Sequence, residues 1–333
     1  MRKIRAAVIG TGSFGELHAQ FYHEYPLTEL VAVVNRTEAR GRRVAERFGV
    51  PWYQTPEELL EKEDFELVSV CTSEQRHKHE GILMAKAGKK MLMEKPLAPT
   101  MEEIDELLKV VEENNTFMAV NYILRQDTRF LDVKRRSDNG EFGDHISYFA
   151  RRRGSFAGAE YYGPWTDILI STAIHDIDLM VWYNGSRPIR VFGESITHKC
   201  RDIGTYDAVV ATIKFENGAI GCIETSWVLP STIPAPLDCS FHLVGTKGGA
   251  FIEGANSGLT VITEKAYTHP DLVHWPVLPT GLRGDLFASM ESVVKSVLAG
   301  TKPFMTGPEA RVSHEIVFAI RESLETHKPV DLV

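Results

Sequence analysis

The sequence predicts an α/β domain with a doubly wound parallel sheet, followed by an α+β domain with a large, mainly antiparallel open sheet. Three observations support this expectation. Short apolar strands alternate with helical patterns up to about residue 123. The first strand runs directly into a glycine-rich turn. Beyond residue 124, strands with alternating polarity follow one another through hairpin turns. We therefore expect two domains, 1–123 and 124–333.

Length and composition restrict the class of protein. The chain has 333 residues, 43% hydrophobic and 25% charged, with a formal net charge of -8. Such a charge argues against a nucleic-acid partner. No apolar run is long enough for a signal peptide or a membrane span, so we expect a cytoplasmic protein without a membrane partner. The four cysteines (Cys71, Cys200, Cys222 and Cys239) lack the spacing of a metal site and are expected to be reduced thiols.

The first strand, 5–9, ends in the glycine pattern Gly10-x-Gly12-x-x-Gly15, which opens a helix. Gly10 permits a tight turn, Gly12 lets the backbone approach a pyrophosphate, and Gly15 lets the helix pack on the strand. Free N–H groups at the helix N-terminus then suit phosphates. This strand–turn–helix context predicts a dinucleotide-binding Rossmann domain. The expected cofactor contacts here are Gly10, Gly12, Ser13, Phe14 and Gly15.

The second strand, 30–34, ends at Asn35-Arg36-Thr37. A site that prefers NAD usually carries Asp or Glu at this position to bind the ribose diol. Asn35 lacks that carboxylate, whereas Arg36 and Thr37 suit a 2′-phosphate. Glu38 returns a negative charge, and Arg36 could instead stack on adenine. The pattern favours NADP over NAD, with use of both as the alternative.

Further helices are expected at 38–48, 56–61 and 101–113, and further strands near 52–53 and at 67–71 and 117–120. Residues that follow the strands lie at the carboxyl edge of a parallel sheet, where ligands bind. We read His77 and His79 as non-metal residues because no ligands at suitable spacing accompany them, and we expect no metal site. The remaining cofactor candidates are Thr72, Ser73, His77, Glu94, Lys95 and Asn121.

The strand 89–93 ends in Glu94-Lys95-Pro96, a charged pair followed by proline. At the carboxyl end of a strand in an open α/β sheet, Lys95 would project toward a bound ligand. The alternative is a surface lysine at a strand–loop junction.

The second half contains alternating strands, joined by turns such as Glu216-Asn217-Gly218. The expected strands are 189–197, 207–215, 219–228, 238–244, 249–253 and 259–263, and the last helices are 284–299 and 308–327. Few helices are available to cover this sheet. One face is therefore expected to form a homodimer or homotetramer contact.

The segment 165–182 predicts a helix in which His175, Asp178 and Trp182 share one face. A carboxylate one turn from a histidine could orient the imidazole. On residue pattern alone, a histidine on such a half-apolar helix is more often a hydrogen-bonded core residue than a catalyst. Arg151-Arg152-Arg153, Tyr161, Tyr162 and Trp165 are candidates for a substrate surface, although the arginines could equally be a solvated face plus one buried ion pair.

Several of these motifs together resemble the glucose–fructose oxidoreductase/inositol dehydrogenase (Gfo/Idh/MocA) family. They are the glycine turn, the segment from Thr72 to His77, the block Ala87-Gly88-Lys89-x-Met91-Leu92-x-Glu94-Lys95-Pro96, and Asn121-Tyr122 with Arg125. The resemblance implies that Lys95 lies beside the nicotinamide and serves proton transfer. It also implies a catalytic histidine in a His-x-x-Asp pattern, matched by His175 and Asp178, and dimers formed through a sheet face.

The chain departs from the family at one position near this histidine. Inositol dehydrogenase-like members carry Asp four residues before it, where this chain has Ser171. Serine can hydrogen-bond but adds no negative charge, which puts an inositol substrate in question. The expected substrate contacts are Arg125, Tyr162, Trp165, Ser171 and Asp178.

The sequence thus predicts an NAD(P)-dependent oxidoreductase. It would transfer a hydride between nicotinamide and a secondary hydroxyl or ketone of a sugar, sugar derivative or cyclitol, with Lys95 and His175 as catalytic residues. One alternative is a glycosidase or epimerase that oxidises its substrate transiently with a bound NAD. The other is a non-catalytic sensor of the nicotinamide redox state.

Overall fold

The computed structural model describes residues 2–332 and divides into two compact units. The first comprises Met1–Gln126 and Trp275–Arg311, and the second comprises Asp127–His274 and Val312–Val333. This division differs from the expected 1–123 and 124–333. The first break lies close to the expected one, but the segment from Trp275 to Arg311 packs with the N-terminal unit.

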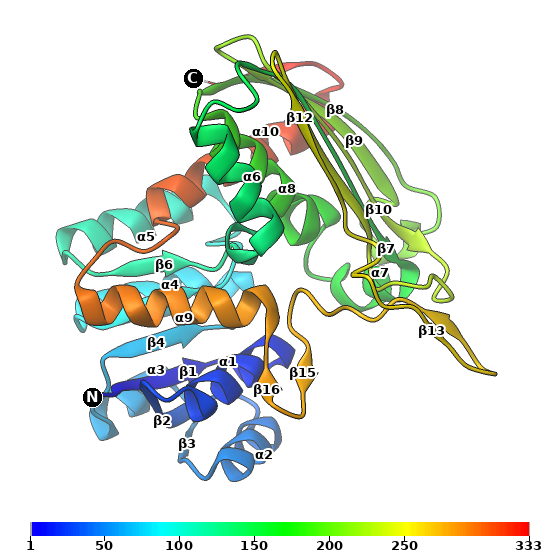
Figure 1. The fold of residues 1–333 in the computed structure, drawn as a ribbon. Coiled ribbons are helices and arrows are strands. Elements are labelled where there is room, and N and C mark those ends of the chain that lie inside the picture. Colours follow the sequence, from blue (N-terminus) through cyan, green and yellow to red (C-terminus); the bar gives the residue numbers. More distant parts are fainter. Residues whose placement is uncertain (1, 333) are drawn as a thin grey trace. The chain divides into compact units, whose positions relative to one another are not determined.

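The first unit is built on a six-stranded sheet with the order β3-β2-β1-β4-β5-β6 (Figure 1). Every adjacent pair is parallel. The strands are β1 (Ile4–Ile9), β2 (Thr28–Val34), β3 (Trp52–Tyr53), β4 (Leu67–Val70), β5 (Lys90–Met93) and β6 (Met118–Val120). The order reverses between β1 and β4, and this reversal is the switch point where doubly wound sheets bind ligands. The predicted Rossmann sheet is confirmed.

Five helices connect these strands: α1 (Ser13–Glu24), α2 (Glu38–Phe48), α3 (Pro56–Lys62), α4 (Glu74–Lys86) and α5 (Met101–Glu113). Their ends follow local chemistry. Thr55 and Thr100 cap α3 and α5, each accepting a hydrogen bond from the backbone N–H three residues later. Helix α2 ends at Gly49, which adopts the left-handed conformation that stops many helices. A short 3₁₀ turn, η1 (Ile123–Gln126), follows β6.

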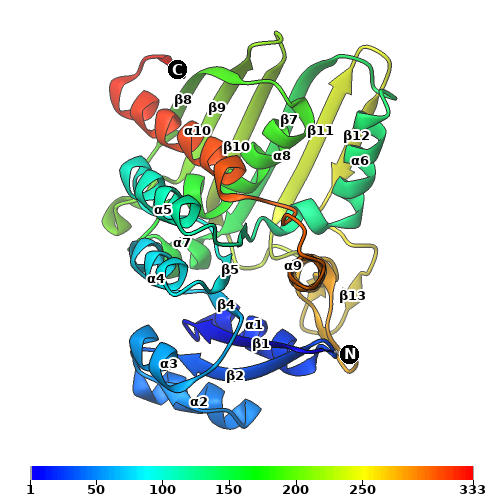
Figure 2. The same ribbon diagram turned by 90° about the vertical axis from the view of Figure 1, so that its left-hand side faces the viewer.

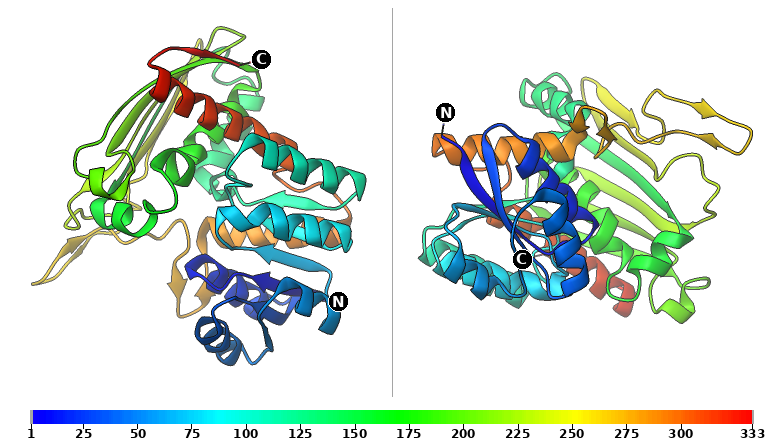
Figure 3. Two further views of the ribbon diagram at one scale, coloured as in Figure 1. Left: turned by 180° about the vertical axis from the view of Figure 1, so that it is seen from behind. Right: turned by 90° about the horizontal axis from the view of Figure 1, so that it is seen from below.

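Helix α9 (Gly284–Ala299) explains why a late segment belongs to the first unit (Figure 3). Its Phe287 ring lies 5.1 Å from that of Phe21 on α1, and its Glu291 accepts a hydrogen bond from Tyr25. Further on, the carbonyl of Met305 accepts a hydrogen bond from the N–H of Val120 in β6. The hairpin β15 (Val277–Leu278) and β16 (Gly281–Leu282) precedes this helix. Apolar packing on α1 therefore decides the assignment, which local sequence pattern does not reveal.

The second unit contains a seven-stranded sheet with the order β12-β11-β7-β10-β9-β8-β17. The strands are β7 (His145–Ser155), β8 (Pro188–Ile196), β9 (Ala208–Phe215), β10 (Ile220–Leu229), β11 (Asp238–Gly245), β12 (Gly249–Glu253) and β17 (Val330–Asp331). Only β7 and β10 pair in parallel; the other adjacent pairs are antiparallel. The prediction of a mainly antiparallel sheet is confirmed.

Helices α6 (Thr128–Asp138), α8 (Ile174–Asn184) and α10 (Gly307–Thr326) cover one face of this sheet (Figure 2). Strand β9 shows the resulting alternation, with Val209, Ala211 and Ile213 buried beneath the helices. Residues of opposite parity lie on the other face, where several large apolar side chains are exposed: Ile196, Val210, Ile220, Val244 and Phe251. This open face matches the expected shortage of covering helices.

The remaining elements are short. They are α7 (Phe156–Tyr162), the π-turn η2 (Leu169–Ala173), the 3₁₀ turn η3 (Arg201–Ile203), and a small hairpin of β13 (Val261–Ile262) and β14 (Tyr267–Thr268). Among residues 2–332, no helix is both long and apolar enough to cross a lipid bilayer.

Candidate active site

The glycine turn between β1 and α1 has the geometry that a bound dinucleotide requires. Gly10 has a φ of 93°, and a Cβ there would lie 2.6 Å from the carbonyl oxygen of Cys71. A Cβ on Gly15 would lie 1.7 Å from the carbonyl oxygen of Gly10. A Cβ on Gly12 would meet nothing within 4 Å. The outer glycines are thus required by packing, whereas the space beside Gly12 remains open for a ligand.

The N-terminus of α1 faces this turn without a side-chain cap. Gly12 occupies the cap position, so the first N–H groups of the helix, from Ser13 and Phe14, have no side-chain acceptor from it. These groups and the positive end of the helix dipole suit a pyrophosphate. The ring of Phe14 packs edge-on against Trp275, 5.0 Å away between centroids.

The residues expected to determine the preference for NAD or NADP lie at the end of β2. The Asn35 side chain donates a hydrogen bond to the carbonyl of Thr37 at 2.9 Å, which stabilises the turn. Arg36 is exposed. Glu38 pairs with Arg42 one helical turn later, at 2.7 Å. The negative charge of Glu38 is therefore balanced within its own helix.

The segment after β4 places Ser73 at the start of α4 and buries His77, which is 1% exposed. Both ring nitrogens of His77 are occupied: Nδ1 lies 2.6 Å from the carbonyl oxygen of Pro96, and Nε2 lies 2.9 Å from that of Thr72. The His77 ring therefore bridges the turns that follow β4 and β5.

The turn after β5 carries Glu94 and Lys95, and its Lys95–Pro96 peptide is cis. Glu94 is 8% exposed, while Lys95 is half-buried. Oε1 of Glu94 lies 3.0 Å from Nε2 of His18 and accepts a hydrogen bond from Asn121 at 2.5 Å. Burial alone would raise the pKa of the Glu94 carboxyl, but the interactions with His18 and Asn121, with a smaller contribution from the positive charge of Lys95, outweigh burial, so the pKa is lowered. Glu94 is thus held as a carboxylate beside Lys95.

Asn121 and Arg125 follow β6 and are both nearly inaccessible, at 1% and 3% exposed. The Asn121 carbonyl accepts a hydrogen bond from Ser289 of α9. Arg125 forms an ion pair with Glu309 at 3.3 Å. The hydrogen bonds from Thr306 and the charge of Arg125 outweigh burial and lower the pKa of Glu309. In this arrangement both residues support the fold of the first unit.

The predicted histidine helix is interrupted at its start. Residues 169–173 form a π-turn, and α8 begins directly after it at Ile174, so His175 lies in the first turn of α8. Ser171 lies within the π-turn, and its hydroxyl is 3.1 Å from that of Thr172. Single π-turns often occur at functional sites because the extra residue redirects the side chains that follow. His175 is half-buried, and its Nδ1 is buried.

Two carboxylates flank His175 along the helix. Asp176 is buried and forms a two-bond ion pair with Arg152 of β7, at 2.8 and 2.9 Å. Asp178 is 1% exposed and accepts a hydrogen bond from Ser313 at 3.3 Å. Both carboxylates anchor the first turns of α8.

The arginine run on β7 resolves into two faces. Arg152 points toward α8, whereas Arg151 and Arg153 lie on the other face. There Arg151 pairs with Asp238 at 2.9 Å, and Arg153 pairs with Glu224 at 2.6 Å. Of the two interpretations of this run, a solvated face with one buried ion pair fits the structure.

Tyr162 and Trp165 lie at the end of α7 and just beyond it. Together with Tyr161 they form an exposed group of aromatic rings, in which Tyr161 contacts both neighbours edge-on, at 4.7 and 5.6 Å between centroids. Their side chains are 42–56% exposed. The aromatic faces are therefore accessible to a ligand.

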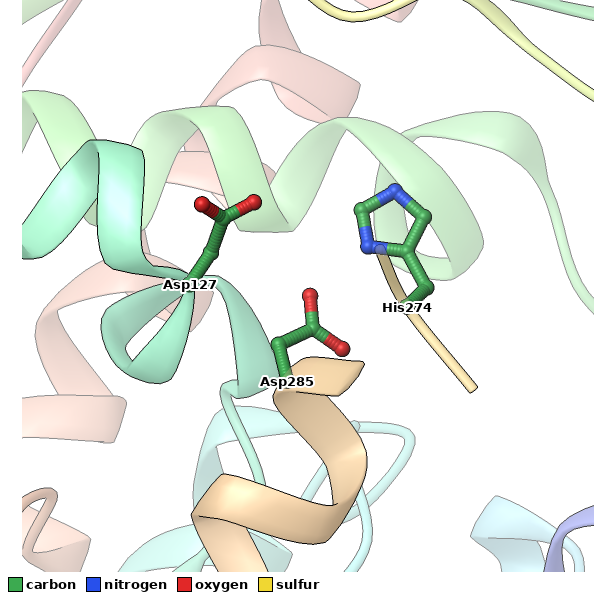
Figure 4. Close-up of side chains that lie close together, drawn as sticks. All are labelled: Asp127, His274 and Asp285. Carbon is green, nitrogen blue, oxygen red and sulfur yellow. The ribbon is translucent and has the colours of Figure 1, made fainter. Parts of the chain in front are cut away.

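Figure 4 draws three further titratable side chains, Asp127, His274 and Asp285. Asp127 caps α6, and one of its oxygens lies within 4.8 Å of a ring nitrogen of His274 in the same unit. Its carboxylate is also bound by the guanidinium of Arg129 at 2.6 Å, which already compensates its charge. Asp285 lies in the first turn of α9 in the first unit and is 2% exposed.

Within the first unit, the parallel strands bring most of the predicted cofactor residues to one edge of the sheet. These residues follow the carboxyl ends of β1, β2, β4, β5 and β6. In the second unit, Ser171, His175 and Asp178 share the π-turn and α8. Sequence reasoning missed His18, whose helical position resembles that of any core residue. It allowed for one buried ion pair in the arginine run but did not identify Asp176 as the partner of Arg152.

Models of known protein families match the chain in two places. Residues 4–122 match the oxidoreductase family with an NAD-binding Rossmann fold, and residues 130–251 match the Gfo/Idh/MocA C-terminal domain.

Individual proteins match over nearly the full chain. One is scyllo-inositol 2-dehydrogenase (NAD(+)) of Bacillus subtilis, 29% identical, with 99% of this chain and 96% of the relative covered. Another is myo-inositol 2-dehydrogenase of Thermotoga maritima, 25% identical, with 99% and 98% covered. Among solved structures, scyllo-inositol dehydrogenase from Lactobacillus casei with bound NAD(H) and scyllo-inositol has a TM-score of 0.86 at 18% identity, with 99% of each chain covered. The chain therefore belongs to the Gfo/Idh/MocA family of oxidoreductases and carries its NAD-binding Rossmann domain.

Proposed function

We propose that this protein is an NAD(P)-dependent dehydrogenase that acts on a secondary hydroxyl of a cyclitol, sugar or sugar derivative. The observation that carries the proposal is Lys95, a half-buried lysine beside an ionised buried carboxylate at the ligand-binding edge of an NAD-binding sheet. The relatives named as inositol dehydrogenases support the substrate class.

When bound, the nicotinamide accepts the hydride from the carbinol carbon or returns it to the ketone. His175 takes the hydroxyl proton in the oxidation and gives it back in the reduction, a role suited to an imidazole. Lys95 donates a hydrogen bond to the substrate oxygen and stabilises its developing negative charge. Asp178, one turn from His175, fixes the helix that carries the imidazole.

The test of these roles uses Lys95→Met and His175→Ala, each assayed with scyllo-inositol, myo-inositol and a panel of hexoses and glucosides. Loss of one proton-transfer group is expected to lower kcat by about 10²–10⁴-fold. Near-normal kcat in both variants contradicts the mechanism. Release of a glycone without net cofactor reduction indicates the glycosidase alternative instead.

The glycine turn also permits a test of cofactor binding. A methyl group on Gly12 meets nothing within 4 Å in the protein itself. We therefore expect Gly12→Ala to fold normally but to bind NAD(H) more weakly, because the methyl group occupies the space that the pyrophosphate needs. Equal affinity in calorimetric titration of the variant and the wild type contradicts binding at this turn.

We further propose that NADP(H) binds more tightly than NAD(H). Asn35 offers no carboxylate for a ribose diol, Arg36 is exposed, and Glu38 is already paired with Arg42. An ion-assisted hydrogen bond of this kind is worth roughly 1.5–3 kcal/mol, or about tenfold or more in affinity.

The variant Asn35→Asp with Arg36→Ala is expected to reverse this order of affinities. Arg40→Ala serves as the matched control, since it removes an exposed positive charge of α2 and leaves both Arg36 and the Glu38–Arg42 pair in place. A wild type that prefers NAD(H) at matched ionic strength shows that Arg36 does not recognise a phosphate.

Finally, we propose that the open face of the second sheet forms a homodimer or homotetramer contact. Phe251, Ile196 and Ile220 on this face are 65%, 60% and 51% exposed, which is unusual for large apolar side chains. Ile220→Lys is expected to lower the oligomeric state in sedimentation. Leu298→Lys is the control, at an exposed apolar residue of α9 in the first unit. A monomeric wild type contradicts this contact.

A further inference from the structure

The two residues that flank Lys95 are each held by a buried histidine. On one side, Nε2 of His18 lies 3.0 Å from Oε1 of Glu94. On the other, Nδ1 of His77 lies 2.6 Å from the carbonyl oxygen of Pro96. His18 and His77 are 0% and 1% exposed. Neither imidazole can therefore meet a substrate, and each acts on the turn that carries Lys95.

The hydrogen bonds around His18 form a chain with one direction. Its Nδ1 lies 2.9 Å from the hydroxyl of Ser69, and that hydroxyl lies 2.7 Å from the hydroxyl of Tyr22. If Tyr22 donates to Ser69 and Ser69 donates to Nδ1, then Nε2 carries the proton and donates to Glu94. Every hydroxyl and ring proton is used in this arrangement. The reverse direction would give Nδ1 the proton and leave the Tyr22 hydroxyl without an acceptor in the described chain.

The chain continues beyond Glu94 into the body of the first unit. Asn121 donates to the same oxygen of Glu94, at 2.5 Å, and accepts from Ser289 of α9 at 2.5 Å. Oε1 thus receives both of these hydrogen bonds, which fix the carboxylate next to Lys95 in the sequence.

His77 holds the other side of the turn by a different arrangement. Its two ring nitrogens lie against the carbonyl oxygens of Pro96 and Thr72. Because a carbonyl oxygen only accepts, a ring nitrogen must carry a proton to form its bond, and each tautomer of the neutral ring can donate to one of the two carbonyls. The ring thus links the turn after β5 to the turn after β4, at the carboxyl edge of the sheet.

We propose that His18 and His77 are positioning residues for Lys95: His18 acts through the Glu94 carboxylate and His77 through the Pro96 carbonyl. This inference rests on the proposed catalytic role of Lys95. If the two histidines only stabilised the fold, all of their variants would lower the stability of the protein to a similar extent. A positioning role instead predicts that the reactivity of Lys95 depends on which hydrogen bond a variant keeps.

The first test measures Lys95 without substrate or cofactor. The protein is labelled with an amine-reactive acetylating reagent, and the rate at each lysine is followed by mass spectrometry. His18→Gln keeps a donor toward Glu94, whereas His18→Asn reaches only Ser69. We expect the labelling rate of Lys95 to rise about tenfold in His18→Asn and to stay near the wild-type value in His18→Gln. The exposed Lys302 serves as the internal reference.

The same measurement tests the other side. His77→Leu is expected to raise the Lys95 rate about tenfold, while His79→Leu, at an exposed histidine of the same helix, leaves it unchanged. Equal Lys95 rates in wild type, His18→Asn and His77→Leu overturn the inference. If His77→Leu does not fold, the His18 pair alone decides, because both of its variants retain a polar amide.

The second test separates this inference from the proposed function. Lys95→Met is expected to be inactive. In His18→Asn we expect kcat to fall about 10- to 100-fold while the dissociation constant for NAD(H) stays unchanged. In His18→Gln we expect kcat to recover. Wild-type kcat in His18→Asn overturns the positioning role and leaves the function standing. Full activity in Lys95→Met overturns both.

Discussion

Removal of the Asp176 carboxylate from α8 is expected to lower the stability of the protein more than removal of an exposed arginine from β7. Asp176→Ala leaves the Arg152 guanidinium buried without its ion-pair partner. Arg152 is 5% exposed and makes two hydrogen bonds to Asp176, so water cannot replace the lost contacts. The affected helix is α8, which carries His175.

The size of the effect follows from burial. Breaking a buried ion pair by removing one partner costs about 3–5 kcal/mol, because a buried charge is left uncompensated. For a domain of 150–250 residues, each kcal/mol lowers Tm by about 2–4 °C. We therefore expect Asp176→Ala to lower the Tm of the second unit by roughly 6–20 °C.

Differential scanning calorimetry measures this change. Arg153→Met is the matched control, because Arg153 is one residue away on the same strand but is one-third exposed, and surface pairs contribute about 0–1 kcal/mol. The double variant Arg152→Met with Asp176→Leu is expected to recover much of the loss, since it removes both buried charges. A Tm for Asp176→Ala equal to that of Arg153→Met refutes the reasoning.

Three further outcomes follow from the structure. Gly15→Ala should destabilise the protein by about 1–3 kcal/mol or more in urea unfolding, because its methyl group would lie 1.7 Å from the Gly10 carbonyl oxygen. Burial, with the negative charges of Glu94 and Glu80, raises the pKa of Cys71 well above its usual value, so iodoacetamide at about pH 8 should modify this thiol only after unfolding. Burial would raise the pKa of Asp207, but hydrogen bonds from backbone N–H groups outweigh burial and lower it. The Asp207 carboxylate therefore stabilises the fold above the unfolded pKa of about 3.9. The Tm deficit of Asp207→Asn should shrink as the pH falls below this value and through the folded pKa.

Sequence pattern predicted the elements well where local chemistry sets them. The strands at 189–197, 207–215 and 249–253 were expected from alternating polarity, and they lie within a residue or two of β8, β9 and β12. The helix at 284–299 was also expected, but not its place in the first unit. That place depends on contacts of Phe287 with residues more than 250 positions away. Periodicity within a segment carries no information about such a partner.

The candidate site shows the same limit. Glycine spacing and the strand ends identified most residues at the edge of the first sheet, because parallel topology alone brings those ends together. The functions of buried side chains were not predictable in this way. His77 was expected to contact the cofactor, but its ring contacts with the carbonyl oxygens of Pro96 and Thr72 were not foreseen. The π-turn at 169–173 likewise has no signature in residue spacing.

The discontinuity of the first unit has a consequence for how the chain folds during synthesis. All six strands of its sheet emerge from the ribosome within the first 120 residues, yet helix α9 emerges only after the whole segment 127–274 has been made. Until then the apolar side of α1, with Phe21, lacks the helix that covers it. The nascent nucleotide-binding sheet therefore remains partly uncovered while the second sheet is translated. Exposed apolar surface on incomplete chains favours aggregation. The unit that begins the chain is therefore completed only near the end of synthesis, just before the last segment of the second unit, Val312–Val333.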